Sequence, residues 1–367
     1  MRAIVLVGGE GTRLRPLTYT TPKPLLPIAN QPFLERQLTW LERHGINEVV
    51  LSLGYLPDAF AARFPDGRFG NLTLRYAVED EPLGTAGGIR YAADVAGIDE
   101  RFVVCNGDVL TTIDLTEMVG FHDAHGGEAT IHLCRVDDPS AFGVVPTRSD
   151  GEVMAFVEKP PPGRVPSHWI NAGTYVLEPS VLERIPPRLT VSIERETFPR
   201  MLDRRGRLFA LQSAAYWIDI GTPAKYLEAH ADVLAGALGA RPVPGAVEQA
   251  PGIWTQGSAS IAADATIEPP VLFGPDIRIA SGAYVSQAVL GAGCSVDKGG
   301  RVVGSVMLEG ACVASEASAL DAVIGPDATL EDGAVAADGT IIGASAVIAA
   351  GSRLSGARVP VQVPTTR

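Results

Sequence analysis

The chain has 367 residues, 46% hydrophobic and 20% charged, which describes a globular protein with room for two domains. Its 42 acidic and 30 basic residues give a net charge of −12 and argue against nucleic acid as a partner, since binding a phosphate backbone requires a basic face. No apolar run reaches the roughly 20 residues that a membrane helix needs, so no membrane partner is expected.

The cysteines form no C-x-x-C pair and lie in apolar, strand-like surroundings. They are Cys105, Cys134, Cys294 and Cys312. This usage favours reduced thiols. A strand is predicted from the start of the chain, so we expect no secretory signal and a cytoplasmic location.

The first predicted element is a buried strand at Ala3–Val7, followed at once by the run Gly8-Gly9-Glu10-Gly11. Glycines let the backbone turn tightly and expose amides that can bind phosphates. Arg13, Arg15 and Lys23 add positive charge close by. The spacing matches neither a dinucleotide-binding fingerprint nor a Walker loop. We therefore predict a phosphate site of another kind after the first strand.

Strand-like and helix-like segments alternate through the first 230 residues. Helices are predicted at Phe33–His44 and Thr85–Val95, and further strands at Val49–Leu53, Leu72–Val78, Phe102–Cys105, Ala129–Val136 and Glu152–Glu158. This alternation predicts an α/β fold with a doubly wound, mostly parallel sheet that binds ligands at the carboxyl ends of its strands.

A six-residue aliphatic period follows from Ser258. Its members include Ile261 and Ile267, Ile279 and Val285, Val296 and Val302, the set Val335, Ile341 and Val347, and the set Ile342, Ile348 and Leu354. The period predicts a left-handed parallel β-helix, in which six residues form one side of a triangular coil and aliphatic side chains point inward. We place a first domain at residues 1–236, a linker at 237–257 and the β-helix at 258–360.

Seven segments together carry a family resemblance. The run Gly8–Leu17 with Pro22-Lys23-Pro24 resembles the signature of the sugar-1-phosphate nucleotidylyltransferases. Six later segments follow in the family's order and are most similar to the mannose-1-phosphate guanylyltransferases, or GDP-mannose pyrophosphorylases. They are Glu81–Gly87, Asn106–Asp108, Glu158–Pro160, Asn171–Tyr175, Ser192–Pro199 and Trp217–Pro223.

The resemblance implies that the first domain transfers a nucleotidyl group from GTP to a sugar-1-phosphate. Mannose-1-phosphate is the favoured acceptor, and GDP-mannose and pyrophosphate are the products. The implied cofactor is Mg²⁺, which would offset the charge of the triphosphate. Positioning and electrostatics would carry the rate, because such a transfer leaves little covalent chemistry to the protein.

The resemblance also assigns the site residues. The implied catalytic residues are Arg13, Lys23, Asp108, Lys159 and Asp219. The implied nucleotide-binding residues are Gly8, Gly9, Gly11, Thr12, Glu79, Gly84 and Thr85. The implied sugar-phosphate residues are Glu158, Lys159, Asn171 and Gly173. Asp108 and Asp219 are the implied metal ligands, since carboxylates and phosphate oxygens suit Mg²⁺. We expect Pro22 and Pro24 to hold Lys23 in an extended segment.

Glu79 bears on the choice of base. It stands five residues before Gly84, where related uridylyl- and thymidylyltransferases have a glutamine. A carboxylate can accept from the adjacent N1–H and N2–H donors of guanine, whereas adenine presents an acceptor at N1. In the alternative interpretation Glu79 is part of a solvent-facing acidic run, and Asp80 or Glu81 would serve equally well.

Other activities remain open from the sequence. The same scaffold could use UTP, dTTP or ATP with glucose-1-phosphate, or GTP with a heptose or cyclitol phosphate such as valienol-1-phosphate. A non-catalytic regulatory paralogue is the alternative of another class, although all five implied catalytic residues are present. Related enzymes fuse the same two domains and use the β-helix as an acyltransferase with a histidine base. No histidine follows His230 here, so we expect no acyl transfer from this β-helix and a role in assembly, as a homo-oligomer, or in regulation.

Overall fold

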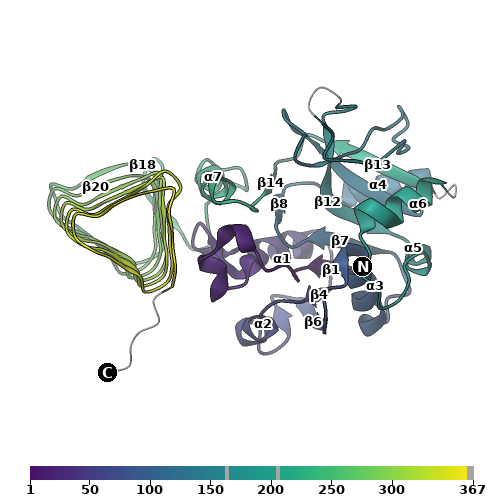
Figure 1. Ribbon diagram of the computed structural model, residues 1–367, viewed down its shortest axis with the longest axis horizontal. Helices are drawn as coiled ribbons and strands as arrows, with labels where there is room; N and C mark the ends of the chain where they lie inside the picture. The colour runs from purple at the N-terminus through teal and green to yellow at the C-terminus, as the bar shows by residue number, and fades with distance from the viewer. Residues whose placement is uncertain (162–164, 204–206, 362–367) are drawn as a thin grey trace. The chain divides into compact units, whose positions relative to one another are not determined.

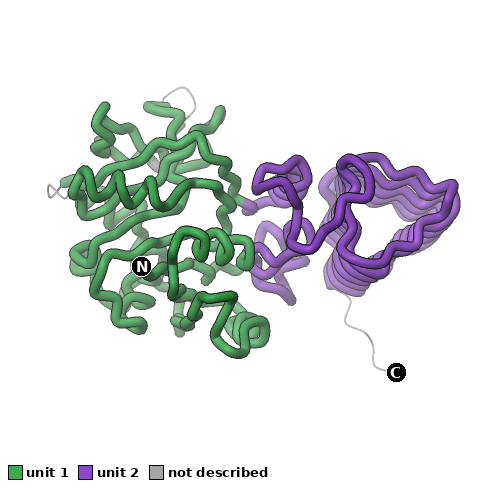
Figure 2. Tube along the Cα trace, turned by 180° about the vertical axis from the view of Figure 1, so that it is seen from behind, with its two compact units in different colours: residues 1–10, 34–219 green, residues 11–33, 220–367 purple. Residues whose placement is uncertain are grey.

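The computed structural model describes residues 1–161, 165–203 and 207–361. It divides into two compact units, each made of two separate stretches of the chain (Figure 2). Unit 1 consists of Met1–Glu10 and Leu34–Asp219, and unit 2 of Gly11–Phe33 and Ile220–Arg367. The glycine-rich run therefore crosses from one unit to the other after Glu10.

Unit 1 is built on one sheet, with ten strands among the described residues. They are β1 (Arg2–Leu6), β4 (Glu48–Leu53), β5 (Arg68–Phe69), β6 (Leu72–Val78), β7 (Phe102–Asn106), β9 (Ala129–Arg135), β10 (Gly143–Val144), β11 (Val157–Glu158), β12 (Trp169–Leu177) and β13 (Leu208–Ser213). The order is β11-β10-β12-β7-β1-β4-β6-β5, with β9 also paired to β12 and β13 paired to β9.

The centre of this sheet is parallel and its flank is not. Strands β7, β1, β4 and β6 run parallel, and Ile4 on β1 registers with Val50 and Val104 on its two neighbours. All three side chains are fully buried, which fits the continuous apolar runs of a sheet covered on both faces. Strand β12 then runs antiparallel to both β7 and β9, so the sheet as a whole is mixed.

Six helices and one short turn accompany this sheet among the described residues. They are α1 (Phe33–Arg43), α2 (Pro57–Arg63), α3 (Gly84–Ala96), α4 (Leu115–His125), α5 (Pro179–Glu183) and α6 (Phe198–Asp203), with a single π-turn η4 at Ile193–Thr197 (Figure 1). The predicted helices at Phe33–His44 and Thr85–Val95 agree with α1 and α3 to within one residue at each end. The predicted strand Glu152–Glu158 is mostly absent, because Glu152 and Val153 form only isolated bridges ahead of β11.

Unit 2 contains a parallel β-helix whose coils appear as stacked triangles in Figure 1. Strand β15 (Val247–Ala250) pairs antiparallel with β16 (Ile253–Thr255) ahead of the coils. The strands of the coils are β16, β17 (Ala259–Ile261), β18 (Thr266–Phe273), β19 (Ile277–Ile279), β20 (Tyr284–Leu290), β21 (Ser295–Val296), β22 (Arg301–Val303), β23 (Val306–Met307), β24 (Cys312–Val313), β25 (Ser318–Leu320), β26 (Val323–Ile324), β27 (Thr329–Leu330), β28 (Val335–Ala337), β29 (Ile341–Ile342), β30 (Val347–Ile348), β31 (Arg353–Ser355) and β32 (Arg358–Val359). The helix α7 (Pro223–Leu234) precedes them.

Stacked aliphatic side chains fill the interior of the coils. Val296, Val313, Leu330 and Ile348 register in turn on consecutive coils and are at most 6% exposed. Val347 was expected to point inward as well, yet it is 46% exposed, because neighbouring residues of a strand face opposite sides.

The coils also begin earlier than residue 258. Within the expected linker 237–257, strand β16 pairs in parallel with β18, so Ile253 registers with Val271.

Candidate functional site

Glycines bring the backbone together at the carboxyl ends of β1, β4 and β7. A Cβ added to Gly54 would lie 3.0 Å from the Gly8 carbonyl oxygen, and one added to Gly107 would lie 2.5 Å from that of Leu6. A larger side chain would clash at Gly107 and be crowded at Gly54. Gly9 follows on the exposed side, so the backbone is accessible at the edge where α/β sheets bind their ligands.

In unit 2 the signature continues through three single 3-10 turns, η1 (Thr12–Leu14), η2 (Leu17–Tyr19) and η3 (Lys23–Leu25). Gly11 has a φ of 61°, and a Cβ there would lie 3.0 Å from the Cβ of Lys23 and from the Cγ2 of Thr18. The Thr18 hydroxyl donates to the Gly11 carbonyl oxygen over 2.9 Å. Glycine at position 11 therefore permits Lys23 to pack directly beside this turn.

The expected nucleotide-binding side chains of this segment differ in exposure. Thr12 and Arg13 are exposed, whereas Lys23 is only 6% exposed. The prediction of an extended segment at Lys23 is wrong. Lys23 opens η3, and the Leu26 amide donates to its carbonyl oxygen over 3.1 Å.

A short antiparallel ribbon in unit 1 brings two carboxylates to the same end. It pairs β8 (Val109–Thr111) with β14 (Trp217–Asp219), and Asp219 registers with Val109, the residue after Asp108. The Trp217 indole donates to the Ala172 carbonyl oxygen over 2.9 Å and ties the ribbon to β12. Both aspartates are partly buried.

This pair fits a hard cation that completes its shell with phosphate oxygens and water. In the described part of the chain no group of three His, Cys, Asp or Glu side chains forms a metal site of the protein's own. A metal held at Asp108 and Asp219 would therefore depend on its substrate for further ligands.

Glu79 lies in the turn between β6 and α3, and its carboxylate is held by the chain. The Ser52 hydroxyl donates to one of its oxygens over 2.8 Å, and the Leu83 amide donates to the other over 2.9 Å. Each oxygen keeps a second acceptor position. Gly84 follows with a φ of 71°, and a Cβ there would lie 2.7 Å from the Val191 carbonyl oxygen.

Asn171 and Gly173 lie at an irregularity of β12, where the pairing with β9 shifts between Asn171 and Tyr175. The Asn171 amide donates to the Tyr175 hydroxyl over 2.8 Å, and its oxygen accepts from the Gly173 amide over 3.1 Å. A Cβ on Gly173 would lie 2.5 Å from the Asn106 side-chain nitrogen. The two hydrogen bonds lie within β12, and the absence of a side chain at Gly173 lets Asn106, the last residue of β7, lie close to this strand.

Glu158 and Lys159 lie at the edge of the same sheet. Glu158 is the second residue of β11, and Lys159 follows it with a φ of 46°. The Lys159 amide donates to the Phe142 carbonyl oxygen over 3.0 Å, and its side chain is exposed.

Glu194 belongs to a segment that matched the family but received no role from the sequence. The hydroxyls of Thr85 and Ser192 each donate to one of its oxygens over 2.8 Å. The other oxygen accepts from the Tyr175 hydroxyl over 3.4 Å. Burial and the Glu194 charge hold the pKa of Tyr175 well above its usual value, so this tyrosine stays a donor.

Glu194 thus connects Thr85, on the expected nucleotide side, with the strand that carries Asn171. Ser192 also caps this turn: its hydroxyl accepts from the Arg195 amide, while Glu196 accepts from the Ser192 amide. This cap does not involve the Glu194 side chain, so it gave no sequence signal for the role of Glu194.

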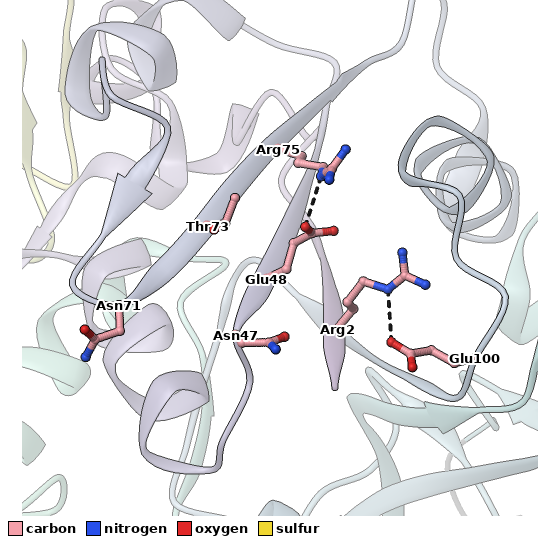
Figure 3. A pocket seen from close by; sticks show the side chains of 7 residues that line it. All are labelled: Arg2, Asn47, Glu48, Asn71, Thr73, Arg75 and Glu100. Carbon is pink, nitrogen blue, oxygen red and sulfur yellow. Dashed lines mark hydrogen bonds and ion pairs between the residues drawn. The ribbon is translucent and has the colours of Figure 1, made fainter.

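A second polar hollow lies at the opposite, amino ends of the parallel strands and has a volume of about 430 Å³. Arg75 pairs with Glu48 and Arg2 with Glu100, each over 3.1 Å (Figure 3). Because these charges neutralise one another, the hollow offers no net charge to an anion. The glycine-rich carboxyl edge is the better candidate for a phosphate ligand.

None of the helices in residues 1–161, 165–203 and 207–361 is long and apolar enough to cross a membrane. Residues 2–236 match the family model described as nucleotidyl transferase. The mannose-1-phosphate guanylyltransferase of Mycobacterium tuberculosis is 39% identical over 311 residues, which cover 84% of this chain and 80% of the relative. Mannose-1-phosphate guanylyltransferase 1 of Arabidopsis thaliana is 39% identical over 90% of both chains.

Among solved structures, HddC from Yersinia pseudotuberculosis in complex with GMP-PN is similar. It is 32% identical with a TM-score of 0.54, over 62% of this chain and 97% of HddC.

Proposed function

This chain belongs to the nucleotidyl transferase family, and we propose that it forms GDP-mannose from GTP and mannose-1-phosphate. A phosphate oxygen of the sugar phosphate attacks the α-phosphorus of GTP. The bond between that phosphorus and the bridging oxygen to the β-phosphate breaks, and pyrophosphate leaves. The observation that carries the proposal is the similarity to guanylyltransferases along 90% of the chain, with both implied metal ligands at one end of the β8–β14 ribbon.

The chain's own residues bind and orient the two phosphorylated substrates, GTP and the sugar phosphate. The amides of the glycine-rich run and Thr12 contact the triphosphate, Lys23 binds its phosphates, and Arg13 stabilises the departing pyrophosphate. Lys159 holds the sugar phosphate. Asn171, Gly173 and Glu158 contact the sugar hydroxyls.

Two further groups complete the proposal. Glu79, Gly84 and Thr85 contact the guanine base. Asp108 and Asp219 hold Mg²⁺, which when bound supplies positive charge that offsets the phosphate oxygens. The β-helix mediates the assembly of a homo-oligomer. The enzyme works in the cytoplasm.

The non-catalytic alternative is weaker. A regulatory paralogue is expected to lose at least one catalytic residue, and all five are present.

Release of pyrophosphate from GTP and mannose-1-phosphate with Mg²⁺ tests the proposal. We expect turnover by the native chain and a kcat reduced by about 10²-fold or more in Arg13→Ala, because a charged contact to the leaving group strengthens in the transition state. Arg75→Ala is the matched control, since this 52% exposed arginine pairs with Glu48 in the charge-neutral hollow. Absence of turnover with every nucleotide and sugar phosphate would favour the regulator.

A further inference from the structure

The segment Gly11–Phe33, called here the signature segment, belongs to the same compact unit as the β-helix. It contains Arg13 and Lys23, two cations of the proposed nucleotide site. The β-helix itself supplies no residue that the family resemblance implies for the chemistry. Because the β-helix lies in the same compact unit as the signature segment, it can contribute by holding that segment in place.

A tight hairpin forms the end of the segment. Strands β2 (Pro27–Ile28) and β3 (Gln31–Pro32) pair antiparallel, and Ala29 and Asn30 between them have φ values of 44° and 59°. A two-residue turn with positive φ at both positions favours asparagine or glycine.

Three hydrogen bonds fix this hairpin within unit 2. The Tyr226 hydroxyl of α7 donates to the Pro27 carbonyl oxygen over 2.6 Å, and the Ala29 amide donates to the His230 Nδ1 over 3.2 Å. The Asn30 side-chain amide donates to the Leu290 carbonyl oxygen at the end of β20 over 3.0 Å. Of these three, the Asn30 bond joins the hairpin to the β-helix.

Apolar contacts accompany these bonds. A small cavity of about 140 Å³ has apolar walls from Leu17, Leu26 and Pro27 of the signature segment and from Leu308, Pro326 and Ala344 of the β-helix. Thr20, Thr21 and Glu309 complete its lining. Leu17, Leu26 and Leu308 are at most 5% exposed. The apolar side of the segment thus faces the coils.

Backbone hydrogen bonds connect the hairpin to the site residue Lys23. The Phe33 amide donates to the Leu26 carbonyl oxygen over 3.0 Å, and the Leu26 amide donates to that of Lys23 over 3.1 Å. Lys23 in turn packs beside Gly11. A displacement of the hairpin therefore displaces the buried lysine.

We propose that the β-helix positions the signature segment for the triphosphate, and that Asn30 is a positioning residue acting through the Leu290 carbonyl. This proposal rests on the proposed function, in which Lys23 binds the nucleotide. It assigns the β-helix a part in nucleotide binding besides any role in assembly.

The test uses Asn30→Gly in the full chain, because glycine keeps the positive φ and removes only the amide. Gln287→Gly is the matched control: it removes an exposed amide from a β-helix residue with a φ of 50°. The measurements are hydrogen exchange of residues 11–33 and the KM for each substrate. In Asn30→Gly we expect faster exchange in this segment and a KM for GTP about three- to tenfold higher. The KM for mannose-1-phosphate should stay within about twofold, and the control should match the native chain.

Asn30→Asp is the second variant. It keeps the turn but sets a carboxylate against the Leu290 carbonyl, so it should raise the KM for GTP at least as much. Native exchange and native KM for GTP in both Asn30 variants would overturn the proposal, as would an equal change in the control. If the native chain turns over no substrate, the proposed function fails, whereas the exchange measurement still decides whether Asn30 anchors the segment.

Discussion

At the residue scale, Glu79 carries the proposed choice of base. Its oxygens already accept from Ser52 and Leu83, so it organises the turn before α3 whether or not it also contacts guanine. We predict that Glu79→Gln weakens GTP use by about 1–3 kcal/mol, because the amide replaces an acceptor with a donor. The measurement is kcat/KM for GTP.

The exposed Glu81→Gln is the control from the same acidic run and should resemble the native chain. An unaltered preference for GTP in Glu79→Gln would transfer base reading to the backbone of residues 83–85.

The burial of His132 on β9 leads us to expect that the free energy of unfolding depends on pH. It is fully buried, neither ring nitrogen has a hydrogen-bond partner among the described residues, and burial lowers its pKa from 6.5 to about 4. Between these values the unfolded chain binds a proton that the folded chain does not, so the free energy of unfolding falls as the pH falls through this window. The loss amounts to roughly 3 kcal/mol at most.

We expect His132→Leu to flatten this dependence in denaturant titrations between pH 7 and about 4. His168→Leu, at an exposed position, should retain the slope of the native chain. An equally steep slope in His132→Leu would assign the dependence to other groups.

At the element scale, the β8–β14 ribbon supports the metal assignment. We predict that Asp108→Asn and Asp219→Asn each raise the Mg²⁺ concentration needed for half-maximal rate, because an amide is a poorer ligand for a hard cation. Titration of the rate with Mg²⁺ checks this. Asp114→Asn, a change at the exposed cap of α4, is the control. A full rate at low Mg²⁺ in either variant would show that the substituted aspartate has a structural role and is not a metal ligand.

Elements with a strong local pattern could be predicted. The apolar run of β1 and the periodicity of α1 and α3 gave bounds that agree with the structure to within one residue. The β8–β14 ribbon and the irregularity in β12 could not be predicted, because they depend on pairing between segments far apart. Coil length is another example: Ser295 registers with Cys312, so that coil has 17 residues and not the 18 that three six-residue sides would give.

At the scale of the whole molecule, the hexapeptide period predicted the β-helix, but nothing local predicted that Gly11–Phe33 belongs to the same unit. The Asn30–Leu290 bond joins residues 260 positions apart, and such a contact leaves no periodic signal. The family motifs predicted the candidate site residues because they follow one another in order, whereas the role of Glu194 emerged only from its partners.

The role of the β-helix is tested by removal of residues 258–367. It should expose the apolar end of a coil, alter the oligomeric state or reduce solubility, and lower activity through loss of support for the signature segment. Light scattering on a sizing column and the rate of pyrophosphate release measure these effects. A soluble truncated chain with the native oligomeric state and rate would refute both roles of the β-helix.

The proposed activity pairs GTP with mannose-1-phosphate. The most direct measurement ranks kcat/KM for pyrophosphate release over the four nucleoside triphosphates, each combined with mannose-, glucose-, heptose- and cyclitol phosphates. We expect GTP with mannose-1-phosphate to rank first. A higher kcat/KM for UTP, dTTP or ATP, or for another acceptor with GTP, would contradict it.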